Sequence, residues 1–493
     1  MTSRTLRSVT LASLGCALAG CAVGPNFVKP KPDVPPQWSA TAAANGTEGA
    51  AHVNSERAQT VSWWSSFNDP KLTSLVQQSA AQNLDVKQAV LRIEEAQAQT
   101  AVVAGGLWPS LSANASWSRQ RISTNTPNGV IFGLNFPGLP PILTNPFNQY
   151  QLGLGASWTL DLFGTARRSI EAANAQMQAA VEGGHAALLS MVSDVAATYI
   201  DLRGAQARRA ILQRSLATQR DLLQLTRDRR NAGLTSDLDV ENATAEVGTT
   251  QAQVPLADRE ITVDINQLSQ LMARPPEALR AELAQAQPVP PVPPVVPIGV
   301  PSDLARRRPD IRQAEANLHA ATAQIGVAVS DYFPRLTLTA AGGYQSVGLS
   351  RLIETASRFA SFGPAIELPV FEGGRLRATV RLQRLKAKEA AVIYAQTVLT
   401  ALNQVEDALA AYGSDQARRA SLETAMTASR NARLLARERY QSGVASFIDV
   451  LDAERTEEQS ELALAEANTA VSADLVQLYR ALGGGWGKPV PAT

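Results

Sequence analysis

The amino-acid sequence predicts a mixed α and β fold that consists mainly of long α-helices and contains an internal two-fold repeat. Three observations support this prediction. The chain repeats short motifs at spacings of 208 to 225 residues, long segments rich in Ala, Gln, Leu and Arg have helical periodicity, and short segments alternate apolar and polar residues. A repeat this long exceeds one solenoid unit, so it indicates one structural half used twice.

The repeat is clearest in two pairs of motifs. The motif Gly-Leu-Thr-Ser-Asp-Leu-Asp-Val begins at Gly233, and Gly-Val-Ala-Ser-Phe-Ile-Asp-Val begins at Gly443. Upstream, Trp-Pro-Ser-Leu from Trp108 is matched by Phe-Pro-Arg-Leu from Phe333. Both glycines follow a long helical pattern, and a short polar residue that can cap a new helix comes three positions later. We therefore expect each half to contain a strand pair followed by a helical hairpin.

Residues 1–20 have the pattern of a secretory signal peptide. Two arginines precede an apolar stretch from Val9 to Leu18, which is too short to span a membrane as a mature helix. The stretch ends in Leu-Ala-Gly-Cys at Cys21 and resembles the bacterial lipobox, in which the cysteine thiol is acylated after cleavage. We therefore expect a covalent lipid on Cys21 and no other cofactor. The alternative is an ordinary cleavage site beside an incidental cysteine.

The mature amino terminus indicates the compartment. Cys16 would leave with the signal, so the mature chain would keep one cysteine and form no disulfide. Ala22 follows the lipid-bearing cysteine, where an aspartate would favour retention in the inner membrane. We therefore expect a lipid-anchored protein of the outer membrane of a Gram-negative bacterium. Residues 21–62, rich in Pro, Ala and Gly, are expected to be a lipidated tether.

Composition excludes several functional classes. The net charge of +1 gives no basic excess for nucleic acid, and no stretch after the signal offers about 18 uncharged apolar residues for a transmembrane helix. His52, His185 and His319 are isolated and are expected on surfaces or helix faces. The chain has no Gly-x-Ser-x-Gly motif, no Walker loop and no cysteine nucleophile. We predict no catalytic residue, no metal site and no enzyme activity.

The first repeat is expected at residues 63–287. It starts with a helix from Leu72 to Ala104, followed by two segments of strict two-residue alternation, each about ten residues long, as in tilted membrane-spanning strands. A soluble β-sandwich with one buried face is the alternative. Pro255 is expected to kink or break the returning helix of the hairpin. The strands are predicted at about 110–120 and 149–161, and the helical hairpin at about 164–273.

The second repeat is expected at residues 302–483, after a proline-rich linker at 288–301. Arg306, Arg307 and Arg308 are expected to be a solvated helix entry. Four membrane strands are too few to close a barrel, so at least two chains would have to share one. The strands are predicted at about 334–345 and 359–370, the hairpin at about 374–482, and a carboxyl-terminal tail at 484–493.

Beside the two-fold repeat, four motifs occur in order along the mature chain: Cys21-Ala22-Val23-Gly24-Pro25, Phe371-Glu372-Gly373-Gly374-Arg375, Asp449-Val450-Leu451-Asp452-Ala453 and the ending Tyr479-Arg480-Ala481-Leu482-Gly483-Gly484-Gly485-Trp486. Taken together, these features resemble the outer membrane factor family, whose members include TolC and OprM, and in particular its NodT-like lipoprotein branch. The match covers essentially the whole mature chain. The family implies a homotrimer in which a 12-stranded outer-membrane β-barrel continues into a 12-helix periplasmic α-barrel.

The resemblance implies an exit duct that passively conducts drugs or other small molecules. Its partners would be a periplasmic adaptor and an inner-membrane pump of the resistance-nodulation-division (RND) type, with outer membrane lipid around the barrel. Two alternatives remain: the exit duct of a type I protein secretion system, and a lipidated periplasmic adaptor.

In this family the helical tips close the periplasmic end. Asp449 and Asp452 align with the acidic positions of that constriction, and their spacing puts both on one helical face. Asp239 in the first half and Tyr440 before the second turn are further gate candidates, and the tips at Gly233 and Gly443 are expected to dock the adaptor. The alternative for the aspartates is a favourable position at a helix start. Some relatives carry an arginine where this chain has Ala445, so a closing network built on that arginine is not expected here.

Overall fold

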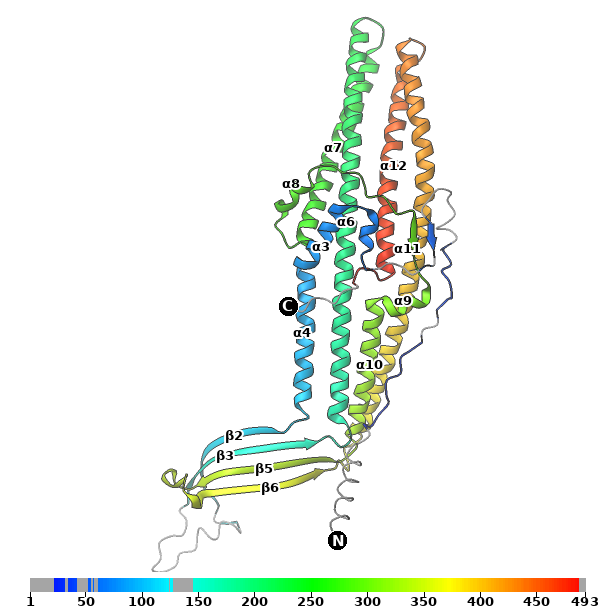
Figure 1. The fold of residues 1–493 in the computed structure, drawn as a ribbon. Helices are drawn as coiled ribbons and strands as arrows, with labels where there is room; N and C mark the ends of the chain where they lie inside the picture. The colour runs from blue at the N-terminus through cyan, green and yellow to red at the C-terminus, as the bar shows by residue number, and fades with distance from the viewer. Residues whose placement is uncertain are drawn as a thin grey trace, which may run out of the picture. The chain divides into compact units, whose positions relative to one another are not determined.

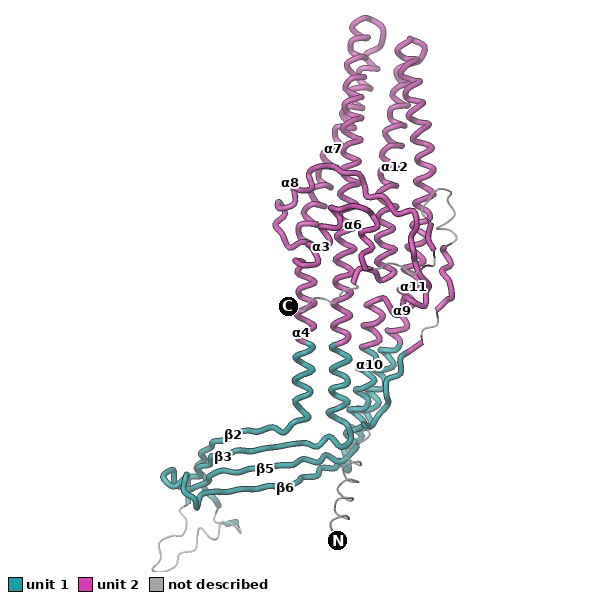
Figure 2. Tube along the Cα trace, in the orientation of Figure 1, with its two compact units in different colours: residues 1–29, 96–177, 317–391 teal, residues 30–95, 178–316, 392–493 magenta. Residues whose placement is uncertain are grey.

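The computed structural model describes residues 22–31, 34–41, 52–54, 56, 61–123, 125–126 and 145–486. Cys21, the predicted signal peptide and part of the tether and tail lie outside these residues. The predicted mainly helical fold is confirmed (Figure 1). The chain forms two compact units, one of residues 1–29, 96–177 and 317–391, and one of residues 30–95, 178–316 and 392–493 (Figure 2). No helix among the described residues has the length and apolar character needed to cross a membrane.

The first unit contains a four-stranded antiparallel sheet in the order β2-β3-β5-β6, so each half of the chain contributes one adjacent pair (Figure 1). The alternation seen in the sequence falls in register across all four strands. Leu111 is paired with Ala156, which is paired with Ala340, which is paired with Phe362. The strands are β2 (Ser110–Gln120), β3 (Phe147–Leu160), β5 (Arg335–Ser346) and β6 (Arg358–Glu367).

The two faces of this sheet differ in polarity. Leu111 and Phe362, on the apolar face, are 73% and 77% exposed. The opposite face carries Ser112 and Ser361 at the adjoining register positions, with small residues between them. The described residues therefore leave the apolar face uncovered, unlike the inner face of the soluble sandwich considered above.

Two long helical hairpins dominate the fold. Helices α6 (Thr165–Asn231) and α11 (Arg375–Gln441) each have 67 residues, and α7 (Asp237–Leu271) and α12 (Phe447–Ala481) each have 35. Each pair is offset by 210 residues, as are the two tip glycines. The expected break at Pro255 is wrong, because α7 continues through it. Pro255 and Gln251 are exposed, so water can reach the carbonyl that proline leaves without a donor.

A helix expected to be continuous from Leu72 to Ala104 is instead two helices, α3 (Pro70–Gln82) and α4 (Leu84–Gly105). Asn83 separates them. Its Oδ1 accepts hydrogen bonds from the backbone N–H groups of Asp85 (2.9 Å) and Val86 (3.0 Å), as a helix cap does. Its Nδ2 donates to the carbonyl of Leu271 at the end of α7 (2.8 Å). This tertiary contact explains the break.

The core of the second unit draws on both halves of the chain. Tyr199 of α6, Leu268 of α7, Tyr412 of α11 and Leu475 of α12 are all fully buried in one cluster. The proline-rich segment 288–301 packs on the same cluster. The smaller elements are η1 (Trp63–Phe67), η2 (Pro276–Leu279), α8 (Arg280–Leu283), α9 (Pro301–Arg307), α10 (Pro309–Ser330), η3 (Leu349–Arg351), η4 (Thr355–Ser357) and a parallel pair, β1 (His52–Asn54) with β4 (Val295–Pro297).

Arg308, expected at a solvated helix entry, and His185, expected on a surface or a helix face, are both buried. Arg308 is only 8% exposed, so the expectation of a solvated entry is wrong for it. It donates to the carbonyl of Ala481 (2.9 Å), one of the last carbonyls of α12, which have no partner within the helix. His185 is also buried; it contacts Glu182 (Nδ1 to Oε2, 3.0 Å) and stacks on Trp486 (4.5 Å between ring centroids).

Candidate gate at the helical tips

Each hairpin tip is a short turn that is built around a glycine. Gly233 and Gly443 have φ of +73° and +75°, a left-handed conformation that favours glycine. The N–H of Leu234 donates to the carbonyl of Arg229, and that of Val444 to the carbonyl of Arg439, both at 2.8 Å. These bonds span the helix end as in a Schellman motif, so each glycine ends its helix and reverses the chain.

The returning helices begin with matching capping boxes. Ser446 donates to the Asp449 carboxylate from its backbone N–H (2.8 Å) and its hydroxyl (2.7 Å), and the Asp449 N–H donates back to that hydroxyl. Ser236 and Asp239 repeat this arrangement in the first hairpin. The hydrogen bonds from Ser446 lower the pKa of Asp449, with a smaller effect of Arg439. Both aspartates therefore stabilise helix starts as carboxylates.

Asp452 lies one turn further along α12 than Asp449, and both side chains are exposed. The Asp449 carboxylate accepts the capping hydrogen bonds from Ser446, whereas the Asp452 carboxylate lies near Arg455. The hydrogen bond that Arg455 donates to Glu246 is the largest cause of the raised pKa of Arg455, and the charge of Asp452 also raises it. The structure therefore places two carboxylates side by side at the start of α12, at the spacing that the sequence indicated.

Tyr440 lies inside the tip and is not at its surface. Its side chain is 4% exposed, its ring contacts that of Phe447 edge-on (centroids 6.0 Å apart), and the guanidinium of Arg229 lies 4.5 Å from its centroid. Arg229 also donates to the Tyr440 carbonyl (3.3 Å). Tyr440 thus joins the end of α6 to the end of α11. The buried residues of this tip cluster are Leu222, Leu223, Ala243, Tyr440, Phe447, Val450 and Leu451.

Polar contacts link the two hairpins behind the tip cluster. Arg455 of α12 contacts Glu246 of α7 (Nε to Oε2, 2.7 Å), and Gln219 of α6 donates to Glu458 of α12 (3.0 Å). Arg214 of α6 pairs with Glu461 of α12 at 2.5 Å. Separation of the hairpins would break these contacts together with the tip cluster.

Glu454 is a buried acid that the sequence reasoning missed. It is 6% exposed, and neither carboxylate oxygen has a hydrogen-bond partner. Burial raises its pKa to about 7; Arg437 and Arg433 oppose the rise, and Glu457 and Glu246 add to it. Glu454 lines a cavity of about 330 Å³ between the hairpins, together with Gln219 and Arg433. Glu454 follows Phe447 and Val450 at helical spacing on the buried face of α12. This spacing is a sequence signal from which its burial could have been predicted.

No group of three or more His, Cys, Asp or Glu side chains in the described ranges is placed to hold a metal ion. The tips present exposed carboxylates at Asp449 and Asp452 beside a buried cluster in which the two hairpins pack together.

A sheet with one uncovered apolar face, in a chain that also carries two long helical hairpins, defines the class of outer-membrane channel proteins. Residues 75–274 and 300–484 match the family model described as outer membrane efflux protein. The chain belongs to this family. It is an outer-membrane efflux channel and not an enzyme.

Characterised relatives extend over nearly the whole chain. Nodulation protein T of Rhizobium leguminosarum bv. trifolii is 31% identical and covers 91% of both chains. Outer membrane protein OprJ of Pseudomonas aeruginosa is 32% identical, over 97% of this chain and 96% of that protein. Among solved structures, the outer-membrane channel OprN is 35% identical with a TM-score of 0.84, covering 94% of this chain and 100% of that chain. The open state of the MtrE outer membrane channel of Neisseria gonorrhoeae is 31% identical with a TM-score of 0.79, over 94% and 99%.

Proposed function

We propose that three copies of this chain form one duct, with twelve strands in an outer-membrane β-barrel and twelve helices in a periplasmic α-barrel. The observation that carries the proposal is the open sheet. Among the described strands, β2 and β6 each have a neighbour on one side only. An open edge in lipid leaves backbone groups without partners, at a cost of several kcal/mol each. Pairing β6 of one copy with β2 of the next removes both edges.

The side chains around the sheet support its position in a membrane. Aromatic residues gather at the ends of the strands that adjoin the long helices, as in the girdle at a membrane interface. Trp108 is 75% exposed, and Phe371 is 90% exposed. Trp158 donates from its indole to the carbonyl of Leu107 (2.9 Å), which leaves its ring at the surface. The apolar face of the sheet would then contact lipid and the Ser- and Gly-rich face would line the lumen.

The helices also offer a surface for a second copy. Leu385, Val392 and Leu399 recur every seven residues on α11 and are 53%, 66% and 59% exposed. Apolar residues at this spacing form the seam of a coiled coil. A neighbouring helix from another copy would cover them, which supports the trimer independently of the sheet.

In this proposal Cys21 carries the lipid anchor, the duct receives small molecules from an RND-type inner-membrane pump, and a periplasmic adaptor docks at the tips near Gly233 and Gly443. Proteins similar to this chain support this role. The toluene efflux pump outer membrane protein TtgC of Pseudomonas putida is 30% identical over 97% of this chain.

The proposed gate is the ring of carboxylates that three copies of Asp449 and Asp452 would form, with Asp239 at the matching place of the other hairpin. Such a ring attracts cations and repels anions. Tyr440 contributes from within, because its buried ring holds the two hairpins together at the tip.

The test removes charge but keeps the helix cap. Asn at position 449 can still accept the hydrogen bonds from Ser446, so the double variant Asp449→Asn/Asp452→Asn alters the ring with little change to the turn. We expect higher conductance and weaker cation selectivity in planar bilayers. Asp221→Ala, an exposed aspartate on α6 away from the tips, is the control. Unchanged conductance and selectivity in the double variant would refute the gate.

A further inference from the structure

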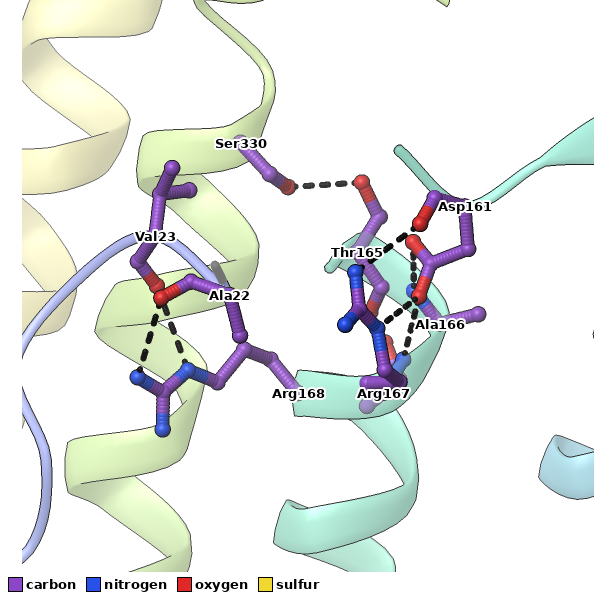
Figure 3. Close-up of polar contacts among 9 residues, drawn as sticks. Ala22, Val23, Asp161, Thr165, Ala166, Arg167, Arg168 and Ser330 are labelled. Atoms are coloured by element: carbon purple, nitrogen blue, oxygen red, sulfur yellow. Dashed lines mark hydrogen bonds and ion pairs between the residues drawn. The ribbon is translucent and has the colours of Figure 1, made fainter. Parts of the chain in front are cut away.

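The amino-terminal segment of the described chain is held in a specific site within the first unit. The site lies beside the turn between β3 and α6, where Asp161 caps α6 by accepting from the backbone N–H groups of Ala166 and Arg167, both at 3.0 Å (Figure 3). The N–H of Val23 donates to the carbonyl of Phe163 in this turn (3.1 Å). The segment is thus attached directly to the start of α6.

Arg168 is the centre of the site. Its side chain is almost fully buried, and Figure 3 shows its guanidinium aimed at the carbonyls of Ala22 and Val23. Its Nε donates to Val23 O (3.1 Å), and its Nη2 contacts Ala22 O (3.5 Å), Gly24 O (3.4 Å) and Asn26 Oδ1 (2.7 Å). The planar guanidinium presents several donors in a fixed geometry, which suits a curved run of backbone carbonyls. Arg168 therefore binds the amino-terminal segment mainly through its backbone carbonyls.

Glu171 balances the buried charge and links two parts of the site. One oxygen accepts from Arg168 Nη1 (2.7 Å), and the other contacts His319 Nε2 (3.0 Å). The His319 ring stacks on Phe27, with centroids 4.4 Å apart. Burial alone would raise the pKa of Glu171, but the hydrogen bonds from Arg168 and His319 outweigh it and lower the pKa. Glu171 thus stays charged and orients both partners.

Close backbone contacts complete the site. Gly24 has a φ of +91°, and a Cβ there would lie 2.4 Å from the Cα of Gly326. A Cβ on Gly326 would in turn lie 2.8 Å from the Cγ of Arg168. Both positions therefore require glycine for the segment, α10 and Arg168 to pack together.

The internal repeat provides a comparison within the same chain. With the offsets of the paired helices, Arg168 corresponds to Ala378 and Glu171 to Arg381, and Gly326 corresponds to Ala101. Ala378 is exposed. The second copy of this helix start therefore lacks both the arginine and its counter-charge. Of the two corresponding helix starts, that of α6 has the residues that bind the amino-terminal segment and that of α11 does not.

We propose that Arg168, Glu171 and Gly326 form a binding site for the chain's own mature amino-terminal segment, which fixes where the lipid on Cys21 enters the membrane. The second part rests on the proposed lipidation. Cys21 directly precedes Ala22 in the sequence, so a lipid on Cys21 would be attached one residue before the segment that the site holds. The stacked rings of Phe163 and Phe333 (4.7 Å) adjoin the site at the aromatic end of the strands. Acyl chains attached there would enter the leaflet nearest the long helices.

The test follows the mobility of the segment in the full chain exported to the membrane. Val28 is 80% exposed, so Val28→Cys can carry a spin label without disturbing the site. We expect a slow label in the parent protein and a several-fold shorter rotational correlation time in Arg168→Met, because the carbonyl contacts are lost. Asn26→Ala, which removes one contact from an exposed residue, should give an intermediate value. Arg381→Met, an exposed arginine at the corresponding helix start, is the matched control and should leave the label slow.

Equal label mobility in the parent, Asn26→Ala and Arg168→Met proteins would overturn the binding site. Lipidation is read separately from the same samples by intact mass and by the number of labels per chain. One label means that Cys21 is blocked, and two mean that its thiol is free. A slow label with two labels per chain would keep the binding site and refute the lipid position. A fast parent label with a blocked Cys21 would keep the lipidation but refute the binding site, and with it the lipid position.

Discussion

Neutralising Glu454 should reduce the pH dependence of the packing of the two hairpins. The carboxyl group is buried without a partner between α11, α12 and the first hairpin, and burial raises its pKa from 4.5 to about 7. At about 1.4 kcal/mol per pKa unit, the packed state loses about 3 kcal/mol per copy when Glu454 ionises. This corresponds to about 300-fold in the ratio of packed to separated hairpins.

The direction follows from proton binding. Between pH 4.5 and 7 the packed state binds more protons at Glu454 than a separated state with solvated Glu454. Packing is therefore favoured below pH 4.5, weakens as pH rises through this window, and carries the full penalty above about pH 7. In Glu454→Gln the penalty from this residue is absent at every pH, so the variant should pack more tightly than the parent at pH 8. Burial also raises the pKa of Glu458 in the same cavity, so a smaller response to pH remains.

Distance measurements between the tips can test this. Leu234 and Val444 are 67% and 68% exposed, one on each tip, and can be replaced by spin-labelled cysteines. The parent should shift towards longer distances from pH 5 to pH 8, and Glu454→Gln should shift less. Glu461→Gln, a glutamate of the same cavity that is paired with Arg214, is the control and should keep the parent's response. The same pH response in the parent and in Glu454→Gln would refute the reasoning.

Three further changes test local parts of the structure. Ser446→Ala removes the cap of α12 and should lower the free energy of unfolding by about 1 kcal/mol, measured by denaturant unfolding. The exposed Ser442→Ala is the control, and an equal effect of both variants would contradict the capping box. Gly443→Ala places a Cβ on a residue with a φ of +75° and should destabilise the tip by about 1 kcal/mol or more. Amide hydrogen exchange at the tip should become faster, and unchanged exchange would contradict the strained turn. Arg308→Met leaves the Ala481 carbonyl without a donor and should cost about 1–3 kcal/mol, whereas neighbouring exposed Arg306→Met should have little effect on the melting temperature.

Much of the helical fold follows from local signals. The turn at Gly443, the cap at Ser446 and the acid at Asp449 lie within seven residues, and they determine the tip geometry among themselves. The alternation in the strands likewise depends on near neighbours, and the sheet register preserves it. Such features can be read from one sequence because the interactions that cause them are close in the chain.

The features that the sequence did not reveal depend on distant partners. Asn83 ends a helix because its side chain reaches Leu271, and Arg308 is buried because the end of α12 needs a donor. Arg168 looked like one arginine among many, yet its partners lie about 145 residues earlier. Glu454 stands in an apolar stripe, but its missing partners become evident only when both hairpins are placed together. The contacts of Asn83, Arg308 and Arg168 have no periodic signal in the sequence, whereas the burial of Glu454 follows the helical spacing of α12.

The most direct test of the central claim is the mass of the assembly extracted from the outer membrane, measured by native mass spectrometry. The account predicts three identical chains, because four strands per copy leave two open edges that a shared barrel removes. Each chain should lack residues 1–20 and carry acyl groups at its amino terminus. A stable single chain embedded in the membrane would contradict the shared barrel, and so would a soluble monomer.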